Sequence, residues 1–261
     1  MLILSIIYTM VKSCIVIIGG GVMGASTAYH LAVRGCTDVV LLEKETFVGQ
    51  GATGRCAGGI RYQFSSDINI RLSLLSLSML DRFEEEHGQA IDLRRCGYLF
   101  LLTRPEDEAV FRQHVTLQHS MGVMTEWLDG DEIHRRVPLL QLDDVLAGTF
   151  HPDEGLADPN SVLMGYINSA RRLGVRILTD MDTTGITVES GKVRAVHTSR
   201  DVIDCEVVVN AGGPWAALVG RMAGLSLPVS PIRRQWLTTT PIPELQSDFP
   251  FVVDFARSLY F

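Results

Sequence analysis

A βαβ pattern near the N-terminus constrains the fold more than any other feature of this sequence. Residues 14–18 are continuously apolar and mostly β-branched, which is typical of a parallel strand covered on both faces. The motif G-x-G-x-x-G follows at residues 19–24, and helix formers occupy residues 25–34. A second apolar strand at residues 39–42 ends on Glu43. These elements, in this order, predict one complete βαβ unit.

Each glycine of the motif has its own geometric role. Gly19 allows a tight turn, Gly21 lets the backbone approach a pyrophosphate, and Gly24 lets helix and strand pack closely. The N–H groups at the helix start then favour the phosphate charge. Glu43 lies nineteen residues after Gly24, where its carboxylate can bind a ribose 2′-hydroxyl and would repel a 2′-phosphate. The unit therefore predicts a dinucleotide site and disfavours NADP.

Composition excludes several classes of protein. The chain has 261 residues, 46% of them hydrophobic, which is enough for one large or two modest domains. Its net charge is −7 and no dense Lys/Arg run occurs, so binding to nucleic acid or to a membrane through a polybasic patch has no support. Five widely spaced cysteines without a C-x-x-C pair, and seven histidines without ligand spacing, argue against disulfides and metals. We expect a cytoplasmic protein.

The first ten residues contain the only candidate targeting segment. Their apolar run lacks a basic start and a cleavage site, and it is too short to span a membrane. We therefore expect no transmembrane segment. Because Met10 stands directly before the first clear strand, we expect translation to start there naturally.

An irregular, glycine-rich segment at residues 49–61 follows the βαβ unit. A plain nicotinamide-binding unit would resume its alternation of helix and strand at this point. The bare backbone and hydroxyl groups could instead line a flavin ring and its diphosphate, and the alternative is a flexible surface loop. The segment favours a flavin over a nicotinamide cofactor.

The rest of the chain alternates between helical and strand patterns, with β patterns dominating towards the C-terminus. We expect helices at 67–86, 105–121, 129–137 and 158–173, and strands at 97–102, 124–128, 145–151, 175–178 and 207–209. A hairpin is expected around Ser190-Gly191, with strands at 186–188 and 193–197. Together with the βαβ unit, this order predicts a mixed α/β protein.

Four segments resemble one enzyme family. They are Gly51-Ala52-Thr53-Gly54-Arg55-Cys56-Ala57-Gly58-Gly59-Ile60-Arg61, Gly97 to Leu102, Asp153-Glu154-Gly155 with Ala157-Asp158-Pro159, and Val207 to Ala216. They resemble FAD-dependent oxidoreductases of the D-amino acid oxidase superfamily. Within it, they are most similar to the β subunits of sarcosine oxidase and dye-linked L-proline dehydrogenase. The resemblance covers nearly the whole chain from Lys12 onward.

The resemblance implies a two-domain flavoprotein. A discontinuous, Rossmann-like FAD domain would take residues 11–80 and 150–222, and a mixed-sheet substrate domain would take 81–149 and 223–261. Such enzymes oxidise the C–N bond of a small amino acid, of the sarcosine, dimethylglycine, glycine or proline type, by hydride transfer to FAD. Relatives continue past residue 261, and residues 228–236 resemble the start of their second substrate-domain sheet. We therefore expect a truncated product or one part of a split enzyme, with weak or no turnover alone.

The resemblance also implies site residues. Arg61 is the expected substrate anchor, because a guanidinium can bind a carboxylate through two parallel hydrogen bonds, and Arg55 is a weaker candidate. No catalytic base stands out. Relatives more often have valine at the position of Thr183, and no histidine precedes the segment to carry covalent FAD. Cofactor contacts are expected from Gly19, Gly21, Val22, Met23, Gly24, Glu43, Lys44, Gly51, Thr53, Arg55, Cys56, Ala57, Gly58, Gly59, Thr183, Asn210, Ala211, Gly212 and Trp215.

Three other functions are compatible with the sequence. The chain could be a D-amino acid dehydrogenase, a non-catalytic flavin-binding fragment or assembly factor, or a nicotinamide enzyme. Neither the substrate nor the electron acceptor is fixed by the residues. A hetero-oligomer with an electron-accepting partner subunit is compatible with all the flavin readings.

Overall fold

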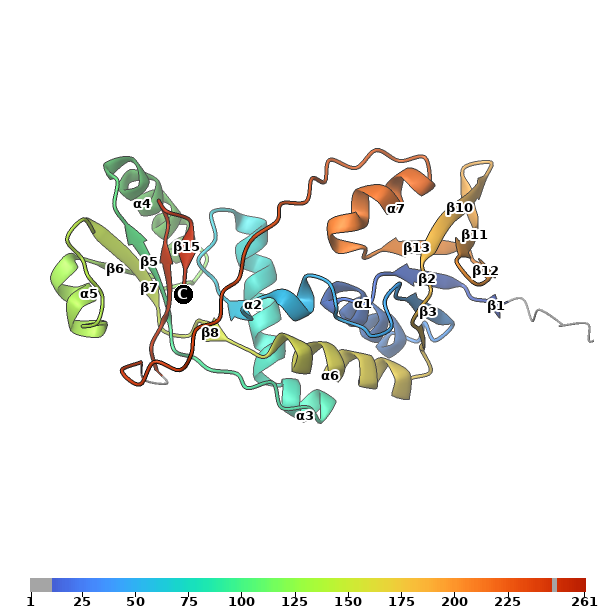
Figure 1. Cartoon of the computed structure of the whole chain (residues 1–261), viewed down its shortest axis with the longest axis horizontal. Coiled ribbons are helices and arrows are strands. Elements are labelled where there is room, and N and C mark those ends of the chain that lie inside the picture. The colour runs from blue at the N-terminus through green and yellow to red at the C-terminus, as the bar shows by residue number, and fades with distance from the viewer. Residues whose placement is uncertain (1–10, 246–247) are drawn as a thin grey trace, which may run out of the picture. The chain divides into compact units, whose positions relative to one another are not determined.

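The computed structural model describes residues 11–245 and 248–261, and the expected start at Met10 lies outside these residues (Figure 1). The chain divides into two compact units. The first consists of Met1–Cys56, described from residue 11 on, and Pro159–Trp236, and the second of Ala57–Asp158 and Leu237–Phe261. The division into a cofactor and a substrate domain stays a prediction.

A four-stranded parallel sheet forms the centre of the first unit. Its order is β13 (Val207–Asn210), β2 (Ile15–Ile18), β3 (Val39–Leu42) and β9 (Arg176–Leu178). The two N-terminal strands are the expected ones, and both are buried because layers cover both of their faces. Ile18 pairs with Leu42 and with Asn210, so the carboxyl ends of three neighbouring strands lie level with one another.

Helices cover one face of this sheet and a second sheet covers the other. Helix α1 (Val22–Val33) packs on β3 and on α6 (Pro159–Arg172), and small residues along α1 are buried. The second sheet has the order β1 (Val11–Lys12), β12 (Val202–Asp204), β11 (Lys192–Thr198) and β10 (Thr183–Glu189). A buried apolar cluster joins the two sheets, including Val16, Ile18, Val40, Leu42, Val196, Ile203 and Val219, the last of these on α7 (Ala216–Met222).

The expected hairpin between β10 and β11 is confirmed. Ser190 and Gly191 both have positive φ, 51° and 75°, which is the geometry of a tight turn whose twist matches that of the strands. The hairpin is also longer than its apolar pattern indicated, because β10 begins at Thr183 and includes polar positions.

A mixed sheet forms the core of the second unit (Figure 1). Its order is β15 (Leu259–Tyr260), β14 (Phe251–Asp254), β5 (Tyr98–Leu102), β7 (Ala147–His151) and β6 (Glu126–Leu128). A separate two-stranded sheet pairs β4 (Gly59–Ile60) with β8 (Gly155–Leu156). The helices of this unit are α2 (Asp67–Asp81), α3 (Phe83–His87), α4 (Pro105–Ser120) and α5 (Gly130–Arg136).

Two sequence expectations differ from the structure. The helix expected over residues 67–86 is interrupted at Arg82, whose φ and ψ of −102° and 10° leave the helical region. The break lets Phe83 turn into the core, where it is completely buried. Residues 228–236, expected to begin a sheet, form no strand. The C-terminal strand β14 instead pairs in parallel with β5 and buries Val252.

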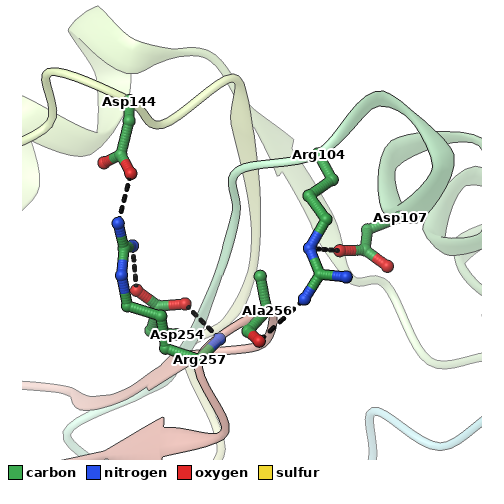
Figure 2. Close-up of polar contacts among 6 residues, drawn as sticks. All are labelled: Arg104, Asp107, Asp144, Asp254, Ala256 and Arg257. Atoms are coloured by element: carbon green, nitrogen blue, oxygen red, sulfur yellow. Dashed lines mark hydrogen bonds and ion pairs between the residues drawn. The ribbon is translucent and has the colours of Figure 1, made fainter.

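Two arginines hold the turn that follows β14 (Figure 2). Arg257 donates to Asp254 Oδ2 at 2.6 Å and to Asp144 Oδ2 at 2.5 Å, while Arg104 donates to the carbonyl oxygen of Ala256 at 2.8 Å. The Arg257 guanidinium lowers the pKa of Asp144 through this hydrogen bond. Exposed ion pairs stabilise a fold only weakly, so the buried side chains of β14 carry most of its docking free energy.

No helix in the described residues is long and apolar enough to cross a bilayer.

Truncating Val252 tests whether β14 is integral to the second unit. We expect Val252→Ala to lower the free energy of unfolding by about 2 kcal/mol, because it removes two buried methyl groups from a closed core. Leu259→Ala is the control in the same hairpin, since Leu259 is exposed and should change stability little. Urea unfolding followed by circular dichroism measures both, and equal effects would contradict this docking of β14.

Candidate functional site

The turns after three parallel strands meet at the carboxyl edge of the first unit's central sheet. Gly19 N–H donates to Leu42 O at 2.8 Å, and Ala211 N–H donates to Ile18 O at 2.9 Å. Gly19 has a φ of 118°, and a Cβ at this position would lie 2.3 Å from Ala211 O. Only glycine fits here, because both the backbone conformation and the contact exclude a side chain. The carboxyl edge of such a sheet is where α/β folds bind nucleotides.

The start of helix α1 packs against the same turn. A Cβ on Gly24 would lie 2.0 Å from Gly19 O, so the third glycine of the motif permits the close approach of helix and strand. The first backbone amides of any helix lack partners within it, and they carry the positive end of the helix dipole. Val22 N–H donates to Thr53 Oγ1 at 3.0 Å. Met23, in the same turn, is exposed.

The first part of the glycine-rich segment folds back onto this helix start. Gly49 N–H donates to Gly20 O at 3.0 Å, and a short 3-10 helix, η1 (Thr53–Arg55), brings the Thr53 hydroxyl to Val22. A Cβ on Gly54 would lie 2.4 Å from Gly49 O, which again requires glycine. The segment is therefore an ordered layer over the βα turn.

Glu43 is buried at the end of β3, where it is 9% exposed. Its Oε2 accepts from Gly20 N–H at 2.8 Å, and its Oε1 accepts from Glu45 N–H at 3.0 Å. Each carboxylate oxygen has a second lone pair, so the group keeps capacity to accept from a ribose hydroxyl. The acid that the sequence analysis selected by spacing lies beside the glycine turn.

Other expected cofactor residues of the first unit surround this edge. The Lys44 ammonium lies 3.8 Å from the centroid of the half-exposed Trp215 ring, and Gly51 approaches the same ring. Asn210 Oδ1 accepts from Gly212 N–H at 3.2 Å, which shapes the turn after β13. Thr183 begins β10 in the second sheet, and its buried hydroxyl has no hydrogen-bond partner among the described residues.

Four expected site residues, Ala57, Gly58, Gly59 and Arg61, belong to the second unit. Gly58 accepts from Ala157 N–H at 3.0 Å, and Gly59 begins β4 beneath the Tyr98 hydroxyl. Arg61 follows β4, and its guanidinium lies over aromatic rings, 4.3 Å from the centroid of Phe64 and 5.2 Å from that of Phe100. Cation–π attraction thus places this cation on an apolar aromatic surface. Arg55 and Cys56 end the part of the segment that belongs to the first unit, and both are exposed.

Tyr98 is a buried aromatic residue of β5 that packs on its neighbours. Its ring stacks on Phe251 with 4.6 Å between centroids and 19° between planes. Burial raises the pKa of Tyr98 to about 12, so the phenol is neutral at physiological pH.

Glu154 is a buried carboxylate that the sequence pattern did not predict. This side chain is 0% exposed, and it accepts hydrogen bonds from Tyr62 N–H, from Gln63 N–H at 2.7 Å and from Gln63 Nε2 at 2.6 Å. Burial raises its pKa from 4.5 to about 7, while the hydrogen bonds and Arg61 oppose that shift. The only sequence feature that could have indicated this group is an acidic residue directly before Gly155, between two strands.

Comparison with known proteins places these features in a family. The family model described as "FAD dependent oxidoreductase" (DAO) matches residues 14–261. Dimethylglycine dehydrogenase, mitochondrial, of Rattus norvegicus is 35% identical over 249 residues, which are 94% of this chain and 29% of that protein. The mouse pyruvate dehydrogenase phosphatase regulatory subunit, mitochondrial, is 28% identical over 94% of this chain and 28% of that protein. The chain thus spans less than a third of the length of either relative.

A solved structure has the same fold. The crystal structure of L-proline dehydrogenase from P. horikoshii superposes with a TM-score of 0.82 at 31% sequence identity. The match covers 96% of this chain and 67% of that one.

Gly24→Ala tests the glycine cradle. We expect a loss of stability on the order of 3 kcal/mol, together with weaker FAD binding, because the new methyl group would collide with the backbone oxygen of Gly19. Gly130→Ala is the matched control, since it adds a methyl group to open space at the start of α5. Thermal unfolding and FAD titration measure both variants. A Gly24→Ala protein as stable as the control would contradict the close packing.

Glu154→Gln tests the buried carboxyl through stability. The native pKa of about 7 exceeds the unfolded value, so the native state holds its proton more tightly. Glu154 therefore stabilises the fold most below about pH 4.5, and this contribution, on the order of 3 kcal/mol, is lost as pH rises to about 7. The difference in unfolding free energy between wild type and Glu154→Gln should shift by that amount. A pH-independent difference for Glu154→Gln would contradict the raised pKa.

Proposed function

The chain belongs to the FAD-dependent oxidoreductase (DAO) family, and from that membership we propose that it oxidises the C–N bond of a small amino acid. The family match confirms the expected resemblance, the mixed α/β fold and FAD rather than a nicotinamide as the cofactor. The proposed substrate is of the sarcosine, dimethylglycine, glycine or proline type. Relatives named for dimethylglycine and for proline support this class.

The first unit would hold FAD at the carboxyl edge of its parallel sheet. The close packing of Gly19, Gly24 and Ala211 holds the start of α1 at this edge, where its amides would bind the diphosphate charge. Glu43 would accept hydrogen bonds from the ribose hydroxyls. FAD supplies a ring that accepts a hydride. The remaining cofactor contacts expected from the sequence are part of this proposal.

The second unit would bind the substrate carboxylate through Arg61. The observation that carries this step is the guanidinium lying on the rings of Phe64 and Phe100, because those rings exclude water on one side and strengthen a charge-assisted hydrogen bond. Fixing the carboxylate orients the rest of a small amino acid. The substrate then loses a hydride from a carbon attached to nitrogen and becomes an imine, which water hydrolyses.

An anaerobic titration of the FAD-loaded chain tests the proposal. Sarcosine, dimethylglycine, L-proline, glycine and D-alanine are added in turn, and loss of the oxidised flavin absorption by one of them identifies the substrate class. We expect a small N-methylated or cyclic amino acid to reduce the flavin. Reduction by D-alanine alone would favour a D-amino acid dehydrogenase.

Arg61→Gln tests the carboxylate site. Loss of a paired, charge-assisted hydrogen bond costs about 1.5–3 kcal/mol, so the Kd of the substrate should rise about tenfold to a hundredfold. Arg71→Gln is the control, because Arg71 lies on the exposed surface of α2, where it pairs with Asp67. Substrate affinity is read from the flavin spectrum under anaerobic conditions. Equal affinity in the two variants would contradict the role of Arg61.

A second candidate is a flavin-binding chain without turnover. It is favoured by the relative named as a phosphatase regulatory subunit, which matches the same share of this chain. Flavin bands that persist with every amine would support it. We also propose that the chain has an electron-accepting partner subunit. We propose a cytoplasmic location for the chain as well. Relatives whose names include mitochondrial show that the family is not restricted to the cytoplasm.

A further inference from the structure

We propose that Glu154 is a positioning residue that couples carboxylate binding at Arg61 to proton uptake from solvent. The inference rests on the proposed function only in taking Arg61 as the carboxylate anchor. It adds a linked proton, a pH dependence and a residue to that site.

Glu154 holds the chain immediately after Arg61. Its carboxylate accepts from the backbone N–H groups of Tyr62 and Gln63 and from the Gln63 side chain. Because two successive amides converge on one carboxylate, the backbone after Arg61 is held in place, and the Arg61 guanidinium donates to Gln63 O of that backbone at 3.2 Å. A change in the charge or position of Glu154 therefore acts directly on Arg61.

The backbone around Glu154 cannot easily retreat. Gly97 N–H donates to Glu154 O at 2.9 Å, and Leu156 exchanges two backbone hydrogen bonds with Arg94, at 2.8 and 3.0 Å. A Cβ on Gly155 would lie 1.9 Å from Arg94 O, so the chain here is packed against its neighbour. With the backbone held and the carboxylate fully buried, a change of protonation is the response to a nearby charge that needs no movement of the chain.

The charged neighbours of this carboxyl are few. Arg61 is the cation that acts on Glu154, and from β5 the facing titratable group is Tyr98. From β7 the network receives the neutral hydroxyl of Thr149, which donates to Gln63 Oε1 at 2.7 Å. His151, also on β7, packs its ring on Tyr62, and burial lowers its pKa.

A bound carboxylate adds a second negative charge to this small set. With Glu154 ionised, the charge of Arg61 is already balanced in part. An anion on Arg61 then raises the affinity of Glu154 for a proton, because two like charges in a water-poor site repel each other. Since the pKa of Glu154 is about 7, the proton is taken up near neutral pH. By linkage, carboxylate affinity must fall as pH rises through that value.

The network can accept the protonated acid. Ionised Glu154 uses Gln63 Nε2 as a donor, whereas protonated Glu154 needs an acceptor. A flip of the Gln63 amide offers its oxygen, and the Thr149 hydroxyl can then rotate to accept from the amide nitrogen. The flip gives up the hydrogen bond that Gln63 Nε2 donates to Tyr98 O at 3.0 Å. A glutamine beside the acid thus lets both protonation states be hydrogen-bonded.

The test uses 3-methylbutanoate as the probe, in which a CH group replaces the amine nitrogen of dimethylglycine. The probe cannot be oxidised as an amine, and it does not titrate between about pH 6 and 8. Titration calorimetry of the FAD-loaded full chain at pH about 7, in two buffers of different ionisation enthalpy, counts the protons bound with the probe. We expect net uptake of a fraction of a proton, and affinity should fall about threefold to tenfold from pH 6 to 8.

Three variants separate the outcomes. Glu154→Gln should bind the probe without proton uptake and without the pH dependence, while His151→Gln, the control for the other nearby group, should keep both. Uptake that persists in Glu154→Gln, or is absent in wild type that binds the probe, would overturn the coupling and leave the carboxylate site intact. Wild type that fails to bind, or Arg61→Gln that binds as wild type does, would overturn the carboxylate site itself.

A second measurement covers the case in which Glu154→Gln does not fold. Difference infrared spectra of wild type, with and without the probe, should show a protonated carboxyl band growing on binding at pH about 7, and carbon-13 glutamate should shift that band. A protonated band that does not change on binding would overturn the proposal.

Discussion

Close contact between backbone atoms at one edge of the parallel sheet is the constraint on which the first unit depends. The Gly19 turn touches Ala211, and helix α1 approaches the oxygen of Gly19 so closely that Gly24 has no room for a methyl group. This packing aims the helix start at the edge and places Glu43 beside the same turn. Because Gly19 and Gly24 have no side chains, main-chain groups form the proposed diphosphate site. The buried strands β2 and β3 hold the turn in place.

The second unit differs from the first because it buries polar side chains. Glu154 and Gln63 are both enclosed. Glu154 accepts from Tyr62 and Gln63, directly after Arg61, while Gln63 also pairs with Tyr98 O and the Thr149 hydroxyl. A buried carboxylate costs free energy unless several donors meet it, and here three donors do so. Apolar residues in the same space would avoid this free-energy cost, so the buried carboxyl is consistent with a functional role.

Local patterns predicted most helices and strands of both units, but not how the strands of the second unit pair. The βαβ unit, Glu43 and the turn at Ser190-Gly191 depend on residues close in sequence, whose periodicity and turn chemistry are visible in one chain. The pairing of β14 with β5 joins residues about 150 positions apart, and no local pattern reports it. Glu154 was likewise invisible as a buried group, because its donors come from Tyr62 and Gln63, far back in the chain.

The same difference applies to the two halves of the glycine-rich segment. Up to Cys56, the role of the segment depends on backbone geometry, so its glycines can be recognised as a motif. The proposed cofactor contacts follow from that motif. From Ala57 on, the role of the segment depends on side chains, which contact residues of β5, of β7 and of the turn before β8. Cofactor class can therefore be inferred from a short stretch of sequence. Substrate class depends on how distant strands surround one arginine, and on the charge of the buried acid behind it.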